Sequence, residues 1–158
     1  MKRLLYLFVL LQITIPVSSQ TDKFTSEDDA IMAVIKKETQ SFFMGEYEDW
    51  KSCWVHSSDI YFEWVRSNVH HFYTEWADLD NVMRPIITEN VSKNDAFYSL
   101  RTDVKIMQDH NMAWVTYRQD LSGDKSDEQR ILIKDDGKWK IIMVTVVASE
   151  TFPKFDSN

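Results

Sequence analysis

Glu38 occupies the position in this chain that most suggests chemistry. It lies in a segment whose apolar residues recur with helical spacing, namely Ile31, Val34, Ile35 and Phe42. At about 100° per residue, Glu38 falls near the middle of this apolar stripe. An unpaired buried carboxylate is very costly, so Glu38 must be paired, protonated or functional. The functional alternative is a proton-transfer group, and the structural alternative is a carboxylate bonded to a Trp, a Tyr or an Arg.

His56 is the second candidate for proton transfer, because an ordinary imidazole titrates near neutral pH. The alternative is a histidine at a pocket edge or in a cap. His70 and His71 are adjacent, and neighbouring side chains of an extended segment point to opposite faces, which suits a metal poorly. Since the sequence has no His-x-His or Glu-x-x-His pair, we predict no metal site and no cofactor.

A helix over residues 26–44 is expected to hold Glu38. Ser26 can cap it, acidic residues follow in its first turn, and Gly45 can end it. A short second helix is expected from residue 46 to about residue 54. One side of that helix carries Tyr47, Trp50, Cys53 and Trp54.

The middle of the chain mixes strands with one helix. Residues 60–65 and, more briefly, 72–75 have strand patterns, with a loop or hairpin tip between them. A helix is predicted over residues 79–88, although Pro85 must kink or shorten it. A further strand is expected over residues 100–108.

The last third of the chain predicts an antiparallel meander. Strands are expected over residues 112–121, 129–134 and 139–149, with a polar loop over 122–127. The pair Asp136-Gly137 between apolar runs is a strong hairpin signal. Helices followed by such strands indicate an α+β fold, with helices on one face of a strongly curved antiparallel sheet.

The final predicted strand is apolar on both faces. In a regular strand, one face would carry Trp139, Ile141, Met143, Thr145 and Val147. The other face would carry Ile142, Val144, Val146 and Ala148. A strand that is apolar on both faces must be covered on both. Helices can cover one face, so we expect the other to line a pocket or to contact a partner.

Three segments carry a resemblance to a known superfamily. They are Gly-Glu-Tyr-Glu-Asp-Trp at 45–50 with the following Trp54, Asp-Ile-Tyr-Phe-Glu at 59–63, and Asp-Gly-Lys-Trp-Lys-Ile at 136–141. In this order the chain resembles the NTF2-like superfamily, which includes SnoaL-like polyketide cyclases and ketosteroid isomerases. It looks most like exported bacterial members of unassigned activity. The resemblance implies a cone-shaped fold, a pocket between helices and sheet, and a homodimer formed through the sheet.

The resemblance also bears on the candidate residues. Ketosteroid isomerases carry an oxyanion-stabilising Tyr seven residues before the glycine, where this chain has Glu38. Glu63 matches the family's Glu at the end of the first strand, but Trp64 stands where the catalytic base would follow. A Trp cannot move protons, so ketosteroid isomerase activity is not expected. The aromatic residues expected at the ligand pocket are Trp54, Tyr61, Trp64 and Trp114.

Residues 1–19 have the pattern of a secretory signal peptide. A positive start at residues 2–3 and an apolar run over 4–11 precede small residues and Gln20. The run is short and wrongly flanked for a spanning helix, the alternative being an uncleaved anchor. We expect export to the periplasm or the exterior, with a single domain over residues 20–158 and no membrane attachment after cleavage.

The net charge limits the classes of binding partner, and the cysteine content limits the covalent cross-links. A formal net charge of −7 argues against nucleic acid and anionic membranes. Cys53 is the only cysteine, so an exported chain has no internal disulfide, and we expect Cys53 to be a small buried hydrophobe.

Two functions agree with these patterns. The first is an exported protein that binds a small apolar molecule in the cone pocket. Its chemistry would be proton transfer of the isomerase, cyclase or dehydratase kind, through Glu38 and His56. The second is a non-catalytic homodimer or partner-binding module in the periplasm, whose apolar sheet face is an interface. The sequence does not decide whether the protein is an enzyme.

Overall fold

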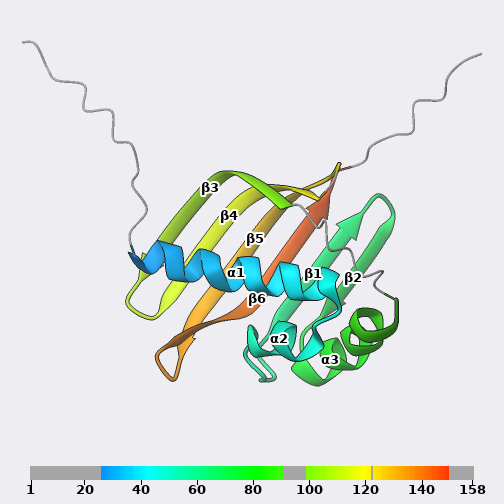
Figure 1. Cartoon of the computed structure of the whole chain (residues 1–158), viewed down its shortest axis with the longest axis horizontal. Helices are drawn as coiled ribbons and strands as arrows, with labels where there is room; N and C mark the ends of the chain where they lie inside the picture. The colour runs from blue at the N-terminus through cyan, green and yellow to red at the C-terminus, as the bar shows by residue number, and fades with distance from the viewer. Residues whose placement is uncertain (1–25, 91–98, 122, 150–158) are drawn as a thin grey trace, which may run out of the picture.

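The computed structural model describes residues 26–90, 99–121 and 123–149. The predicted signal peptide lies outside these residues. Within them, no helix combines the length and the apolar character needed to cross a bilayer. Three helices and a six-stranded curved sheet make up this part of the chain, which confirms the predicted α+β class (Figure 1).

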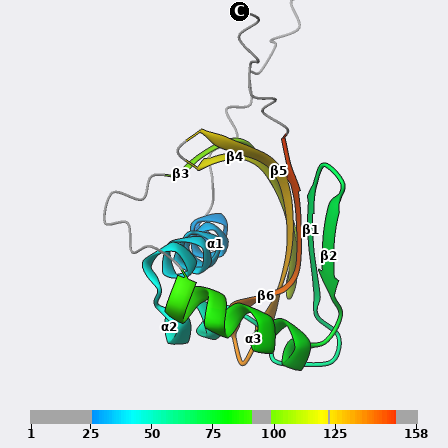
Figure 2. The same ribbon diagram turned by 90° about the vertical axis from the view of Figure 1, so that its right-hand side faces the viewer.

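Helix α1 spans Ser26–Met44, as the apolar spacing predicts, and it crosses the concave face of the sheet (Figure 2). Ile31 and Ile35 are fully buried on its inner side. The helix ends at Gly45, whose φ of 75° is a left-handed conformation that glycine adopts without strain. The regular 3.6-residue period therefore fixes which residues α1 turns toward the sheet, and Glu38 is one of them.

Helix α2, Tyr47–Ser52, is shorter than predicted. The chain leaves the helix because Cys53 and Val55 bond to strand β6 instead. Ile141 N–H donates to Cys53 O at 2.8 Å, and Val55 N–H donates to Ile141 O at 2.9 Å. Helix α3, Trp76–Pro85, begins earlier than predicted and passes into a π-helical turn over Ile86–Asn90. This irregular turn follows the proline, which cannot donate the usual helical hydrogen bond.

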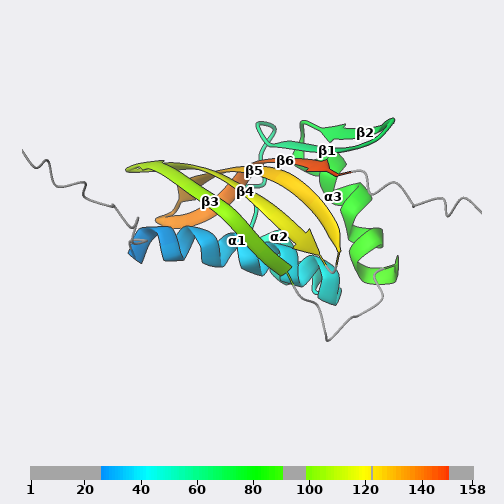
Figure 3. The same cartoon turned by 90° about the horizontal axis from the view of Figure 1, so that it is seen from above.

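The sheet has the strand order β2-β1-β6-β5-β4-β3. The C-terminal four strands form the predicted antiparallel meander, and β1 joins it in parallel with β6. Viewed from above, the strands arch over α1 (Figure 3). The strands are β1 Tyr61–Arg66, β2 Val69–Tyr73, β3 Ser99–Asp109, β4 Met112–Leu121, β5 Asp124–Asp135 and β6 Lys138–Ala148.

Both polar connections are shorter than predicted: the one between β1 and β2, where the hairpin-tip alternative is confirmed, and the loop predicted over residues 122–127. Strand β2 already begins at Val69, next to Arg66 of β1. Strand β5 begins at Asp124, next to Leu121 of β4, so most of the segment 122–127 predicted as a loop is strand. The second error has a physical cause, since the inner face of β5 is polar and its sequence reads like a loop.

A β-bulge corrects the predicted faces of the last strand. Ile131 pairs with Met143 whereas Leu132 pairs with Ile141, so Ile142 is an extra residue in β6. The bulge reverses the alternation, and Val144 is fully buried on the same side as Ile141. Beyond it Val147 faces outward and is 47% exposed. The predicted sharing of one face by Trp139, Met143 and Val147 is therefore wrong.

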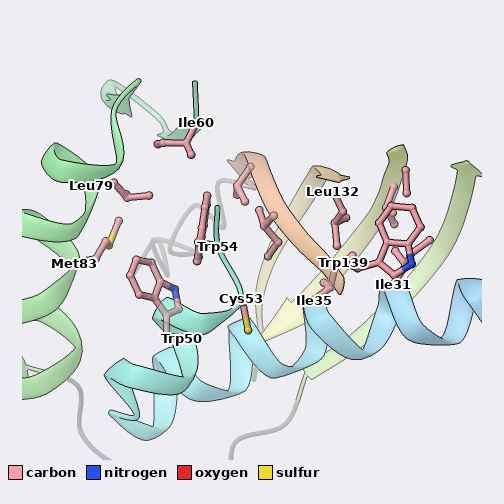
Figure 4. Close-up of a cluster of buried hydrophobic side chains, with 14 of the residues drawn as sticks. Ile31, Ile35, Trp50, Cys53, Trp54, Ile60, Leu79, Met83, Leu132 and Trp139 are labelled. Atoms are coloured by element: carbon pink, nitrogen blue, oxygen red, sulfur yellow. The ribbon is translucent and has the colours of Figure 1, made fainter. Parts of the chain in front are cut away.

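The apolar core lies between the helices and the concave face of the sheet. Ile31 and Ile35 of α1 contact the sheet near Leu132 and Trp139 (Figure 4). At the other end of α1, side chains from α2, α3 and the segment before β1 fill the space. These are Trp50, Trp54, Ile60, Leu79 and Met83.

Candidate functional site

Two neighbouring pockets, called here the two lobes of one cavity, lie beside α1 and share part of their lining. The first, called the sheet lobe here, has a volume of about 250 Å³ and lies against β1, β5 and β6. Its apolar walls include Phe62, Val144 and Val146, and its polar side chains come mainly from α1, β4 and β5. The polar side chains are Glu38, Thr39, Gln119, Ser126, Glu128 and Arg130, with Arg66, Asp124 and Lys125 at one end.

The second lobe, called the aromatic lobe, has a volume of about 320 Å³ and lies between α1, the β1–β2 hairpin and α3. Four residues line both lobes, namely Glu38, Phe42, Phe62 and Trp64. The lining of the aromatic lobe is completed by Trp50, His71, Tyr73, Val82, Met83 and Ile86. Glu38 is thus the carboxylate at which the two lobes meet.

Glu38 is only 6% exposed and is partly hydrogen-bonded. Its Oε1 accepts a hydrogen bond from Trp50 Nε1 at 3.1 Å, and its Oε2 lies 3.6 Å from Arg130 Nη1. Thr39 Oγ1 is 3.3 Å from Oε2, but it is also 3.1 Å from Ile35 O, and one hydroxyl hydrogen serves one acceptor well. The structure therefore shows the Trp and Arg neighbours that the structural alternative requires. It also leaves the Glu38 carboxylate able to accept a further hydrogen bond.

A buried ionic network, which sequence reasoning missed, lies beside Glu38. Glu128 accepts hydrogen bonds from Arg130 Nη2 at 2.7 Å and from Tyr117 Oη at 2.9 Å. Two more donors complete its shell, Gln119 Nε2 at 2.6 Å and Ser126 Oγ at 2.9 Å. Arg130 Nε in turn donates to Tyr117 Oη at 2.9 Å. Glu128 is thus saturated with donors and held as a structural carboxylate.

One sequence signal could have revealed this network. Ser126, Glu128 and Arg130 alternate along β5, and Tyr117 and Gln119 alternate along β4. Polar alternation on paired strands places such side chains on one face. The sequence analysis misses it because Ser126 lies in the predicted loop over 122–127 and Glu128 lies just before the predicted strand over 129–134.

Burial and neighbouring charges fix the protonation states of Tyr117 and Arg130. Burial raises the pKa of the Tyr117 phenol to about 12, so its hydroxyl keeps its proton. Burial by itself would lower the pKa of the Arg130 guanidinium, but Tyr117, Glu38 and Glu128 together hold it above its usual value. Arg130 is therefore a permanent cation shared by two carboxylates. Its Nη1 has no hydrogen-bond acceptor among the residues that the structure describes.

His56 and Glu38 do not line a common lobe. Its side chain is exposed at the end of α2, where Nε2 lies 3.0 Å from Lys51 O. The ring stacks on Trp76 with centroids 4.2 Å apart. His56 lines neither lobe, so its position matches a capping role.

The four aromatic residues predicted at the pocket are distributed differently. Trp64 lines both lobes, whereas Trp54 is fully buried in the core. Tyr61 precedes Phe62 in β1, and strand alternation turns it away from the cavity. Trp114 is 42% exposed on the outer face, because its neighbours Ala113 and Val115 face the core. Of these four predicted residues, only Trp64 lines the cavity.

No group of three His, Cys, Asp or Glu side chains within residues 26–90, 99–121 and 123–149 could hold a metal ion. Cys53 is buried, and burial, with Glu38 nearby, raises the pKa of its thiol to about 12. A thiol in that state is a poor nucleophile and behaves as a small apolar side chain.

Comparison with known proteins identifies the fold. No protein family profile and no curated protein match the sequence. Among solved structures, an NTF2-like protein of unknown function from Silicibacter pomeroyi is 8% identical, with a TM-score of 0.63 over 80% of this chain and 100% of its own. A cystatin-like protein of unknown function from Nostoc punctiforme is 14% identical, with a TM-score of 0.62 over 83% and 98%. A protein described as a proposed dehydratase of the NTF2-like family, from Streptomyces avermitilis, is 12% identical, with a TM-score of 0.59 over 77% and 95%. Together with the helices packed inside a curved sheet, these similarities show that the chain has the NTF2-like fold.

Proposed function

We propose that the two-lobed cavity binds a small, largely apolar molecule and that Glu38 exchanges a proton with it. One observation carries this proposal: Glu38 is a buried carboxylate that borders both lobes and is not saturated with donors. A carboxylate in an apolar cavity can act as a general acid or base, since its environment tunes its proton affinity.

Glu38 is better suited to this role than Glu128. Four side-chain donors occupy the oxygens of Glu128, whereas Glu38 accepts a well-placed hydrogen bond from Trp50 and faces Arg130 without one. Each oxygen of Glu128 accepts two hydrogen bonds, whereas Glu38 can still accept a hydrogen bond from a bound molecule. Isomerisation, dehydration and cyclisation each include at least one such proton transfer, and in an isomerisation the proton that Glu38 removes is returned to another atom of the same molecule. The proposed dehydratase among the structural neighbours fits that class.

A ligand screen tests the proposal. The wild-type domain and Glu38→Gln are mixed with a set of small apolar alcohols, ketones and aromatic compounds, and melting temperatures are compared. We expect at least one compound to raise the melting temperature of the wild type and to raise that of Glu38→Gln less. Glu48→Gln, at an exposed position of α2, serves as the matched control and should respond like the wild type. Absence of any shift across the set would refute ligand binding.

We further propose that the protein works outside the cytoplasm after removal of residues 1–19. The charged start and apolar run of that segment support this. Expression in a Gram-negative host with cell fractionation and mass spectrometry tests it. We expect a periplasmic protein that begins at Gln20, and a full-length cytoplasmic product would contradict the proposal.

A second candidate function is homodimerisation through the outer face of the sheet. An apolar row crosses five neighbouring strands on that face, because Met107 pairs with Trp114, Trp114 with Ile131, Ile131 with Met143, and Met143 with Tyr61. Met107 and Trp114 are exposed. A contiguous apolar surface of this kind is typical of an interface.

Light scattering at several concentrations tests the dimer. The wild type should have the mass of two chains, and Trp114→Lys should shift it toward one. Leu100→Lys adds the same charge at an exposed position near the start of β3, outside the row, and should leave the mass unchanged. A wild type that is monomeric at all concentrations would exclude this function.

A further inference from the structure

The aromatic lobe has a lining that favours a positively charged ligand. Five aromatic side chains, from four elements, surround it together with one carboxylate. They are Phe42 of α1, Trp50 of α2, and Phe62, Trp64 and Tyr73 of the β1–β2 hairpin. The face of an aromatic ring carries partial negative charge, so several rings together with a carboxylate make an environment that favours a cation.

The charged groups are unequally divided between the two lobes. Arg66, Lys125 and Arg130 all line the sheet lobe. Among the described residues that line the aromatic lobe, there is no lysine or arginine, and the charged or titratable side chains are Glu38, His71 and Tyr73. The imidazole of His71 stacks beside Trp64, with ring centroids 5.9 Å apart.

Arg130 compensates the charge of Glu38 only in part. Its Nη2 is committed to Glu128 at 2.7 Å, and the separation from Glu38 is 3.6 Å. The other nearby guanidinium, Arg101, donates to Thr39 Oγ1 at 2.8 Å and lies over the Tyr117 ring. Neither guanidinium makes a hydrogen bond to Glu38 in the described part of the chain, so its carboxylate can still attract a third cation.

A ligand that fills the aromatic lobe must shield Glu38 from solvent. A neutral hydrocarbon offers no compensation for this desolvation, and an anion would be repelled by the carboxylate and by the ring faces. A cation with apolar substituents satisfies both surfaces, because its charge faces Glu38 while its carbon atoms contact the rings.

We propose that the aromatic lobe binds a small alkylammonium ion, with Glu38 as counter-ion and Trp64 as the main aromatic contact. The inference rests on the proposed function and narrows its ligand to an organic cation. Trp64 is singled out because indole binds cations most strongly among the aromatic side chains and because this residue borders both lobes.

A pair of isosteric probes tests the inference. Choline and 3,3-dimethylbutan-1-ol have nearly the same shape, but only choline carries a charge, since carbon replaces nitrogen in the alcohol. Isothermal titration calorimetry on the intact domain should show choline binding at least about tenfold more tightly than the alcohol. Trp64→Leu should weaken choline binding about tenfold and change alcohol binding much less, while Trp64→Phe should retain most of the choline affinity.

Two further variants complete the design. Glu38→Gln should weaken choline binding without weakening that of the alcohol, and circular dichroism verifies that the variant is folded. Phe72→Leu removes an exposed ring from the outer face of the same hairpin and should bind choline as the wild type does. If Glu38→Gln does not fold, the Trp64 variants decide the question alone.

The outcomes are distinct from those of the ligand screen. Equal or tighter binding of the alcohol overturns the inference, and so does the absence of choline binding. If choline does not bind but neutral apolar compounds bind in a manner that depends on Glu38, the proposed function is supported and only the inference of a cationic ligand fails. If no compound of either kind binds, both proposals fail.

Discussion

Arg130 Nη1 lies 3.6 Å from Glu38 Oε2, which is within the range of an ion pair but beyond a good hydrogen bond. The same guanidinium is bound firmly to Glu128 through Nη2. One cation therefore stabilises two buried carboxylates, one of them saturated and the other available. This asymmetry separates a structural acid from a candidate functional acid within one cluster.

Arg130→Met should lower the free energy of unfolding by about 3–5 kcal/mol, because both carboxylates would lose their shared counter-charge while remaining buried. Urea unfolding followed by tryptophan fluorescence measures the change. Arg118→Met is the control, since Arg118 pairs with Asp103 and Asp127 at the surface and should cost no more than about 1 kcal/mol. A comparable effect of the two substitutions would show that the buried network contributes little.

Tyr117→Phe should lower the free energy of unfolding by about 1–3 kcal/mol. Its hydroxyl accepts from Arg130 Nε and donates to Glu128 Oε2, so its loss leaves a buried donor without an acceptor. The same urea experiment gives the value. Tyr73→Phe, at a half-buried position of β2, should change the stability less than Tyr117→Phe.

Acid should weaken the link between α2 and α3. Burial acts to raise the pKa of Asp80, but hydrogen bonds from Tyr47 and Arg84 outweigh it and leave the pKa below its usual value. Asp80 therefore stabilises the fold above the unfolded pKa of about 3.9, and this contribution is lost as the pH falls through the lower folded value. Asp80→Asn should reduce the slope of stability against pH in that range. Asp78→Asn, exposed in the first turn of α3, should leave the slope nearly unchanged.

Alkali should destabilise the fold through two phenols. Burial raises the pKa of Tyr47 and of Tyr117 to about 12, with Asp80 adding to the effect at Tyr47. A raised folded pKa means that the contribution is complete below the unfolded value of about 10 and is lost as the pH rises toward about 12. Ultraviolet absorbance of tyrosinate, recorded with circular dichroism, should show these two phenols ionising only as the structure unfolds. Ionisation of every tyrosine near pH 10 in the folded protein would contradict this.

The helical part of the site could be predicted from the sequence. The 3.6-residue period of α1 alone places Glu38 on the buried side, and the structure shows it there. The partners of Glu38 could not be predicted in the same way, because Trp50 and Arg130 come from distant segments. Glu128, which accepts a hydrogen bond from Arg130, also lies outside the predicted strand over 129–134, next to a polar stretch that resembles a loop.

The aromatic residues show a second limit of sequence reasoning. Burial of Trp54 and exposure of Trp114 depend on which face of the sheet the helices cover, and local periodicity does not contain that information. The bulge at Ile142 is similar, since a single inserted residue exchanges the faces of everything after it. Resemblance to the NTF2-like superfamily predicts the architecture. Which side chains face inward depends on the register of the strands, which the resemblance does not give.

The parallel pairing of β1 with β6 has a consequence for folding kinetics. The β3–β6 meander joins neighbouring strands through short turns, whereas β1 must find a partner about 80 residues away, as in the pairing of Phe62 with Val144 and of Trp64 with Val146. Contacts that close long loops form late. The cavity straddles this seam, with Phe62 and Trp64 on one side and Val144 and Val146 on the other. A molecule bound there contacts both β1 and β6. It should therefore slow the detachment of the β1–β2 hairpin from the β3–β6 meander.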